Sequence, residues 1–421
     1  MSLGTYRRAA SVCVVLGVVG ALAAGPACAA PSDTPAAGGG APISIAAAGD
    51  CTFPSQVVAS TPWALQRVLL DELWNAGTGN GVSVAVIDTG VDNANLQLKD
   101  KVVDGGSLLK DRQTGASDGG NGFSDKVGHG TKVAGIIAAR PMNGTGFVGL
   151  AKDATILSVR QNDSDGNGDV SSLIAAIDIA VAKGVKVINI SQDVRATGEE
   201  GTFAFKDDLK AALQRAEAQK IVVVASSGND GHEGDTFPAA FDTVLAVGAS
   251  DRNNERAQFS QYGKFLDVVA PGVDMLSTVP AGGHCVDNGT SFSTPYVAGV
   301  AAILKGMYPD WTAAQVRARI EQSAQRNERG WNKFIGWGVV DPVKAVQGGA
   351  QQDPVPHEDA AVKLDSAPIV AQPLGLAETQ ADRDRRTGTF VLASGALVVA
   401  GLAGGSVVLR DFRRRQRAQQ G

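Results

Sequence analysis

The chain has 421 residues, of which 44% are apolar, and a formal net charge of −5 at pH 7. A chain of this length and composition can bury a full hydrophobic core. The slightly acidic balance excludes the basic excess that nucleic-acid-binding surfaces need, so we expect no nucleic-acid partner.

Residues 1–30 have the organisation of a secretory signal peptide. A pair of arginines precedes the apolar run 12–24, and small residues at 27–30 follow as a cleavage site. Lipid attachment at Cys28 and twin-arginine export are alternatives, but the residues around each motif fit them poorly. We therefore expect an exported chain, in which residues 31–62 form an N-terminal extension that begins with a disordered stretch rich in Pro, Ala and Gly.

Helical and strand patterns alternate after this extension. A helix is predicted at 63–74, where apolar residues recur at helical spacing after a Thr-Pro start signal. Strands are predicted at 82–88, 155–160, 185–191, 221–225, 244–248 and 266–270, and helices at 172–183, 205–219, 293–307 and 312–325. Such alternation predicts an α/β domain whose parallel sheet is covered by helices on both faces. The glycine-rich, polar stretch 100–126 is predicted to be a long loop.

Three polar side chains stand at positions where this fold places ligand sites. Asp88 ends the first apolar strand, and His129 lies between two glycines before a small-residue helix. Ser291 precedes another small-residue helix, whose unpaired N–H groups would stabilise negative charge. A reactive serine also needs a base and a carboxylate that orients this base. Taken singly, each residue has a simpler interpretation, as a turn aspartate, a helix-entry histidine or an N-cap serine.

Together, and in the order Asp, His, Ser, these motifs resemble those of the subtilase family of serine proteases. The resemblance extends over about residues 63–346 and includes the segment 221–230, which is similar to the strand that carries the family's oxyanion-hole asparagine. It implies a serine endopeptidase in which Ser291 is the nucleophile, His129 the base and Asp88 the orienting carboxylate. It also implies that Asn229 helps to hold the oxyanion. No cofactor is expected.

The same resemblance implies a cleft for a polypeptide substrate. We expect cleft-edge strands to pair with an extended substrate, and the candidate residues are Ser191, Gln192, Ser226, Ser227 and Gly228. The continuation Gln192-Asp193-Val194 differs from the glycine-rich sequence common in the family, which leaves the side-chain preference open.

Residues 163–169 mimic the start of a calcium-binding loop, with oxygen ligands at alternate positions. Ile174 stands where such a loop needs its bidentate glutamate, so a solvated loop is favoured and no metal site is predicted. The remaining histidines, His232, His284 and His357, are expected to be solvated surface residues.

Two cysteines remain once the signal peptide is removed, namely Cys51 and Cys285. In an exported protein they allow one intramolecular disulfide, which would join the extension to the neighbourhood of Ser291. Unpaired or intermolecular thiols are the alternative.

The C-terminal part has the composition of a membrane anchor. Residues 349–388 combine Pro, Ala and acidic residues without periodicity and are predicted to be a flexible linker. Residues 389–409 are uncharged, and as a helix they would span about 30 Å, the thickness of a bilayer core. The basic tail 410–421 favours a cytoplasmic C-terminus, with the rest of the chain outside the cell membrane.

An extension, a catalytic domain at 63–348, a linker and one membrane helix resemble the architecture of the mycosins, which are membrane-anchored subtilases of type VII secretion systems. The resemblance implies processing of exported proteins, with the secretion machinery as a partner. A structural role with incidental proteolysis and a scavenging surface protease are alternatives. Subtilases usually carry a folded inhibitory propeptide, but the extension is too short to bury a core, so we expect it to be retained.

Overall fold

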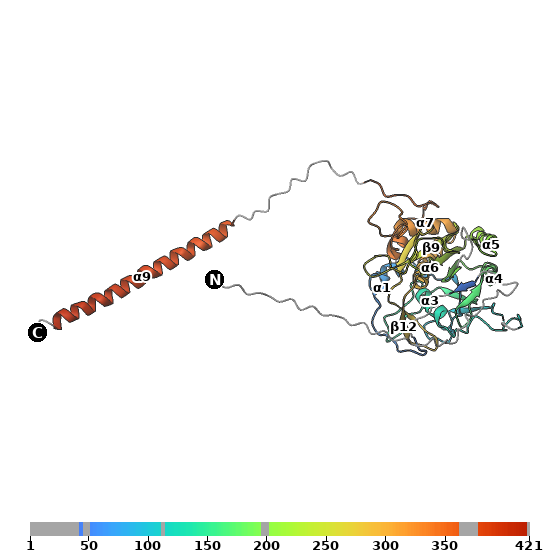
Figure 1. Cartoon of the computed structure of the whole chain (residues 1–421), viewed down its shortest axis with the longest axis horizontal. Helices are drawn as coiled ribbons and strands as arrows, with labels where there is room; N and C mark the ends of the chain where they lie inside the picture. The colour runs from blue at the N-terminus through green and yellow to red at the C-terminus, as the bar shows by residue number, and fades with distance from the viewer. Residues whose placement is uncertain (1–41, 45–50, 111–113, 195–201, 362–377, 419–421) are drawn as a thin grey trace, which may run out of the picture. The chain divides into compact units, whose positions relative to one another are not determined.

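The computed structural model describes residues 42–44, 51–110, 114–194, 202–361 and 378–418 (Figure 1), and of residues 42–44 only the backbone. The chain divides into two units, Met1–Ala360 and Ala361–Gly421. The predicted signal peptide at 1–30 lies outside the described residues.

A parallel sheet of seven strands forms the centre of the first unit, in the spatial order β10-β9-β8-β6-β2-β4-β3. The strands are β2 (Ser83–Asp88), β3 (Val102–Ser107), β4 (Thr155–Arg160), β6 (Val187–Ile190), β8 (Val222–Ser226), β9 (Val244–Ser250) and β10 (Val268–Pro271). On one side of β2 the chain forms the edge strand β3 and then inserts β4 between them, and on the other side it adds β6, β8, β9 and β10 in turn. The carboxyl end of β2, where Asp88 lies, is therefore at the point where open α/β sheets bind their ligands.

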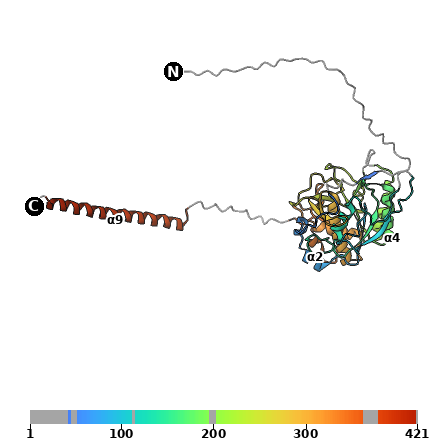
Figure 2. The same ribbon diagram turned by 90° about the horizontal axis from the view of Figure 1, so that it is seen from below.

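Helices cover both faces of this sheet, which confirms the predicted fold class. One face packs against α3 (His129–Ala138), α6 (Thr290–Met307) and α7 (Ala313–Ser323), and the other against α4 (Val170–Ala182) and α5 (Lys206–Ala218). Along β2, Val84 and Val86 enter the first core, while Ala85 and Ile87 enter the second. Helices α2 and α4 belong to opposite cores and lie on different sides of the first unit in Figure 2.

The predicted helix at 63–74 is wrong in detail, because it forms as two short helices, α1 (Trp63–Gln66) and α2 (Leu70–Ala76). The turn between them lets Val68 reach the same core as Leu65 and Leu73, while Leu69 stays exposed. Packing of this kind overrides the helical spacing that the sequence shows. The short helix α8 (Pro342–Gln347) packs on this core as well.

The predicted loop at 100–126 is also wrong in part, since it contains the edge strand β3. Only two apolar residues begin this strand, and its backbone pairing with β4 provides what the side-chain pattern lacks. A hairpin of β11 (Met275–Thr278) and β12 (His284–Asp287) was likewise not predicted.

A small second sheet incorporates part of the N-terminal extension. Strand β1 (Pro42–Ser44) lies between β5 (Asn167–Asp169) and β7 (Asp193–Val194) and is antiparallel to both. Ile43 is opposite Gly168 on one side and Val194 on the other. A segment that was predicted to be disordered therefore occupies the centre of a three-stranded sheet.

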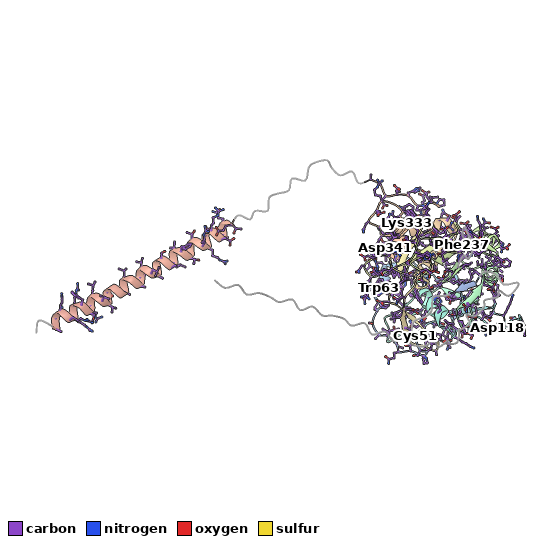
Figure 3. The ribbon with its side chains drawn as sticks, viewed as in Figure 1. Cys51, Trp63, Asp118, Phe237, Lys333 and Asp341 are labelled. Carbon is purple, nitrogen blue, oxygen red and sulfur yellow. A yellow bond between two sulfur atoms is a disulfide. The ribbon has the colours of Figure 1, made fainter. Side chains whose placement is uncertain are left out.

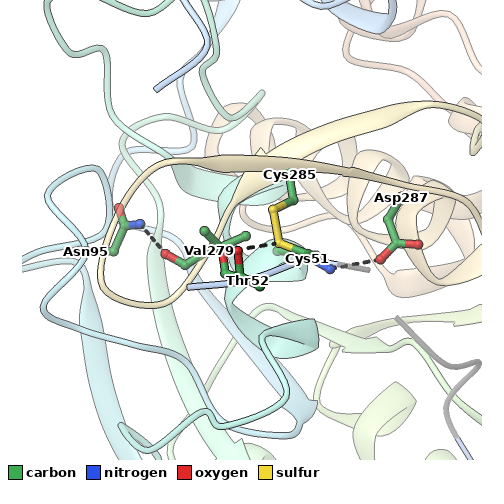
Figure 4. Close-up of a disulfide and its surroundings, with 7 residues drawn as sticks. Cys51, Thr52, Asn95, Val279, Cys285 and Asp287 are labelled. Carbon is green, nitrogen blue, oxygen red and sulfur yellow. Dashed lines mark hydrogen bonds and ion pairs between the residues drawn. A yellow bond between two sulfur atoms is a disulfide. The ribbon is translucent and has the colours of Figure 1, made fainter. Parts of the chain in front are cut away.

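A disulfide joins Cys51 to Cys285 across 234 residues, with Cα atoms 6.2 Å apart, which confirms the predicted pairing (Figure 4). We call residues 51–62, which begin at this disulfide, the strap. Its first residue, Cys51, and the residue after its end, Trp63, are labelled in Figure 3. Backbone hydrogen bonds join the strap to the β11–β12 turn, from Ser55 N to Gly282 O and from His284 N to Gln56 O, each 3.0 Å long. On the chain-entropy model, closing so long a loop contributes about 5 kcal/mol to stability.

His284 is not a surface residue as predicted but is 3% exposed. Its Nδ1 accepts a hydrogen bond from Val58 N of the strap at 3.1 Å, and its Nε2 pairs with Gln97 Oε1 at 2.7 Å. Because Nδ1 accepts a backbone N–H, the ring is neutral with its proton on Nε2. Burial lowers the pKa of His284, since the charged imidazolium would be poorly solvated there.

The beginning of the predicted linker belongs to the first unit. Ala350 O accepts a hydrogen bond from Trp311 Nε1 at 3.0 Å, and Asp359 forms an ion pair with Arg326 at 2.7 Å. Most of the remaining linker, 362–377, lies outside the described residues.

The second unit contains α9 (Gln380–Ala418), a helix of 39 residues that extends beyond both ends of the predicted span at 389–409. Among the described residues it is the one helix long and apolar enough to cross a membrane.

We expect His284 to make the first unit less stable in acid. Its folded-state pKa lies below the ordinary value of 6.5, so its contribution to stability is complete above pH 6.5 and is lost as the pH falls through the folded-state value. Unfolding by denaturant between pH 7.5 and 4.5 should show a smaller loss of stability in His284→Gln than in the wild type. The exposed His357→Gln is the control, and equal pH slopes in all three proteins would contradict this account.

Candidate active site

Asp88 and His129 form a buried pair at the carboxyl end of β2. His129 Nδ1 lies 2.8 Å from Asp88 Oδ1 and 3.0 Å from Oδ2, and each residue is 1% exposed. A nitrogen that faces a carboxylate carries the proton, so Nε2 is the unprotonated nitrogen of the ring. This Nε2 is buried and has no hydrogen-bond partner among the described residues. The imidazole is thus oriented by the carboxylate and can accept a proton on its other side.

Two glycines allow this close approach of β2 and α3. A Cβ on Gly130 would lie 2.0 Å from the backbone oxygen of Gly90 and 3.1 Å from Asp88 Cβ. Gly90 itself has φ +105°, a conformation that residues with a side chain rarely adopt. The glycines beside Asp88 and His129 therefore let the two side chains meet.

Ser291 lies in the first turn of α6, which follows Gly289 as N-cap, and is 3% exposed. Its hydroxyl donates to the backbone oxygen of Ser191 at 3.0 Å. In return the Ser191 hydroxyl donates to the backbone oxygen of Ser291 at 2.9 Å. That oxygen is available because Pro295, one turn further along α6, has no N–H to donate to it.

Ser291 is followed by Phe292, whose ring centroid lies 5.3 Å from that of the His129 imidazole. The hydroxyl of Ser291 is bonded to Ser191 in this structure, and His129 Nε2 is not hydrogen-bonded. The hydroxyl must therefore give up its bond to the Ser191 carbonyl before it can donate its proton to the imidazole. Such bonds are often loose in unliganded proteins and tighten when substrate binds.

Asn229 follows β8 and faces the same helix start. Its Oδ1 accepts hydrogen bonds from Thr290 N at 2.9 Å and from Thr290 Oγ1 at 3.1 Å. These two bonds fix the amide plane and turn its NH2 group away from Thr290, where it can act as a donor.

The five substrate-binding candidates have different surroundings. Ser191 contacts Ser291 directly, and β7 follows Ser191 and Gln192. The side chain of Gln192 is instead committed to the interior, where it donates to Gln161 Oε1 at 2.7 Å. Ser227 likewise donates to Gln261 O at 3.1 Å.

Ser226 is the last residue of β8, and Gly228, with φ +100°, forms the turn before Asn229. The sequence analysis missed β5, although it lies opposite β7 across β1. It also missed Asp125 and Thr89, which contact each other beside the Asp88–His129 pair.

A search of the described residues finds no cluster of three or more His, Cys, Asp or Glu side chains that could hold a metal ion. In the loop at 163–169, Asp163 Oδ1 accepts hydrogen bonds from the backbone nitrogens of Asp165 and Asn167, both at 2.9 Å. Asp169 at its end caps α4 by accepting from Ser172 N at 2.8 Å.

Comparison with known proteins agrees with this geometry. Residues 79–338 match the Subtilase family. The chain is 38% identical over 293 residues to Subtilisin NAT of Bacillus subtilis subsp. natto, which covers 68% of this chain and 72% of that protein. It is also 38% identical to Subtilisin of Bacillus pumilus, over 68% of this chain and 99% of that protein.

Solved structures of mycosins are similar to this chain too. MycP3 protease from the type VII (ESX-3) secretion system has a TM-score of 0.61 and 28% identity, covering 73% of this chain and 92% of that one. MycP1 from Mycobacterium smegmatis has a TM-score of 0.61 and 29% identity, covering 78% and 93%. The resemblance to the mycosins is confirmed, and the chain belongs to the subtilase family and is a serine endopeptidase.

Proposed function

We propose that this endopeptidase is a membrane-anchored processing protease of a type VII secretion system, and that Asp88, His129 and Ser291 are its catalytic triad. The observation that carries the triad is the buried pair of His129 and Asp88: the imidazole contacts Phe292 in the first turn of α6, and its Nε2 has no hydrogen-bond partner among the described residues. A buried carboxylate and an oriented imidazole beside a helix-start serine have the arrangement that nucleophilic catalysis needs.

The reaction is acyl transfer to water. Ser291 Oγ leaves the Ser191 carbonyl, donates its proton to His129 Nε2 and attacks the peptide carbon, while Asp88 stabilises the imidazolium that forms. The negatively charged oxygen is held by the Asn229 amide and by Ser291 N at the start of α6, where the helix dipole adds to the stabilisation. His129 then returns the proton to the leaving amine, and water hydrolyses the acyl-enzyme by the same steps.

Strand addition is the proposed mode of substrate binding. β1 already lies between β5 and β7 as an extended backbone would. Where β1 advances from Ile43 to Ser44, its partner on β7 changes from Val194 to Asp193. A peptide in the place of β1 therefore runs toward Ser191, whose carbonyl is hydrogen-bonded to Ser291. The residues that follow in such a peptide would reach Ser291 in the N-to-C direction proposed for a substrate.

Labelling tests the assignment of the nucleophile. We expect Ser291→Ala to abolish labelling by a fluorophosphonate probe and to lower peptide hydrolysis by about 10³-fold or more. The matched control is Ser293→Ala, because Ser293 is buried in the same turn but donates to Ala270 O at 3.0 Å. Labelling that survives in Ser291→Ala and disappears in Ser293→Ala would refute the assignment.

β1 should compete with peptide substrates, since it occupies the position proposed for them. Every N–H of a central strand points to one neighbour or the other, so Ile43→Pro removes a hydrogen bond of β1. We expect this variant to have a KM for a short peptide about three- to tenfold lower than the wild type, with unchanged kcat. Ile43→Ala, which keeps the N–H, is the control. An unchanged KM in Ile43→Pro would show that β1 does not compete.

The membrane part of the proposal rests on α9 and the arginines at its end. The uncharged run 389–409 lies within one continuous helix, and the basic residues after it favour a cytoplasmic C-terminus, which puts the protease outside the membrane. The similarity to mycosin structures, three of which are described as belonging to ESX type VII secretion systems, supports a place beside that machinery.

Secretion assays separate proteolysis from a structural role in the secretion system. We expect a Ser291→Ala strain to accumulate uncleaved exported proteins, which sequencing of the N-termini of secreted proteins would detect. The control is a strain that lacks the whole chain. Normal secretion in Ser291→Ala combined with failure in the deletion would favour the structural role. Equal cleavage of generic proteins such as casein would favour a scavenging protease.

A further inference from the structure

Asp125 is a buried carboxylate that the proposed mechanism does not use. It lies in the loop before His129 and is 8% exposed. Its Oδ1 accepts hydrogen bonds from Thr89 Oγ1 at 2.8 Å, Gly128 N at 2.7 Å and Val127 N at 3.2 Å. Its Oδ2 accepts from both the backbone nitrogen and the hydroxyl of Thr131, at 2.9 and 2.6 Å. One side chain thus receives hydrogen bonds from both sides of the Asp88–His129 pair.

On the strand side, the contact is made through Thr89. The backbone nitrogen of Thr89 donates to Asp88 Oδ1 at 2.8 Å, so Thr89 holds the same oxygen that pairs with His129. The hydroxyl of Thr89 donates to Asp125 at 2.8 Å, lies 3.3 Å from Asp88 Oδ1 and accepts from Gly130 N at 3.0 Å. Thr89 therefore joins the end of β2 to the start of α3.

On the helix side, Asp125 caps α3. The N-cap residue is Gly128, which has no side chain to accept a bond from the first turn. A Cβ there would lie 2.3 Å from the ring of Phe53 in the strap, and the backbone has φ +82°, so a capping side chain at this position is excluded. Asp125 supplies the missing acceptor through Thr131 N, and its charge is favourable at a helix N-terminus.

We propose that Asp125 is a positioning residue for catalysis, which acts through Thr89 and Thr131 to hold Asp88 and His129 in register. This role rests on the proposed function of the pair. A displacement of about 1 Å at a catalytic group can cost about 10²-fold in rate, so a residue that sets the distance between β2 and α3 controls turnover without touching substrate.

The chemistry of Asp125 fits this role. The backbone N–H groups around it can only donate, and both carboxylate oxygens are engaged as acceptors. Burial raises the pKa of Asp125, and the hydrogen bonds from Thr131, Gly128 and Thr89 oppose that shift. An asparagine in its place would direct an NH2 group at one of these sets of donors, which leaves buried groups unpaired.

Steady-state kinetics of the full chain in detergent test the proposal. We expect Asp125→Asn to lower kcat by about 10- to 100-fold for a short peptide while KM changes less than about twofold. The rate of fluorophosphonate labelling should fall in parallel. The control is Thr145→Val, which removes another partly buried hydroxyl, bonded to Val58 O, and should lower stability without changing kcat.

A second pair of variants keeps the test decisive if Asp125→Asn does not fold. Thr89→Val removes the hydroxyl that joins Asp125 to the strand while keeping the shape of the side chain, and Thr89→Ser keeps the hydroxyl. We expect kcat to fall about tenfold in Thr89→Val and to be largely restored in Thr89→Ser. Equal kcat in the two variants, or a folded Asp125→Asn with wild-type kcat, would overturn the proposal.

One readout separates this proposal from the assignment of the triad. The low-field proton NMR signal of His129 Nδ1–H reports the hydrogen bond to Asp88 and needs no turnover. It should shift or broaden in Asp125→Asn and in Thr89→Val but not in Thr89→Ser. If the wild type neither hydrolyses peptides nor labels, the triad assignment fails, and the NMR comparison still decides whether Asp125 positions the pair.

Discussion

The hydrogen bond between the buried side chains of His129 and Asp88 is the interaction on which the rest of the site depends. A carboxylate without water is costly unless donors surround it, and here His129 and the backbone of Thr89 provide them. The parallel sheet makes this possible because β2 ends where the first turns of α3 and α6 meet. The glycines beside both residues remove the side chains that would hold the two segments apart. The packing of the sheet, the glycines and the hydrogen-bond donors thus all help to bring Asp88 and His129 together.

Much of the fold could be predicted because short, mainly apolar runs rich in β-branched residues indicate buried parallel strands. Residues 155–160 form β4 with the bounds that the sequence predicts, and the small-residue run after Ser291 forms α6, which is buried from Thr290 to Lys305. The hydrophobic pattern was not sufficient to predict strands that are held by backbone pairing and not by buried side chains. Strand β3 has only two apolar residues at its start, and β1 is a short segment in a low-complexity extension. Their partners lie far along the chain, and a local pattern carries no sign of them.

The candidate site divides in the same way. The positions of Asp88, His129, Asn229 and Ser291 could be predicted because each stands in a motif next to a strand or helix. The bonds between them could not. Asp125 lies close to His129 in the sequence, but its bond to Thr89 spans 36 residues and depends on how two loops fold together. The exchange of hydrogen bonds between Ser191 and Ser291 spans 100 residues. His284 was misjudged because nothing near it in the sequence indicates that the strap covers it.

The proline within α6 has a mechanical consequence. Since residue 295 offers no N–H, the backbone oxygen of Ser291 is tied to Ser191, just beyond the end of β6, and not to its own helix. Ser291 is therefore bonded to Ser191, at the end of the sheet, through its main chain as well as through its hydroxyl. The bond from the Ser191 hydroxyl to the backbone oxygen of Ser291 does not depend on the Ser291 hydroxyl, so the side chain of Ser291 can rotate while its Cα stays in place. Thermal bending of α6 after Pro295 would therefore leave the Cα of Ser291 in place.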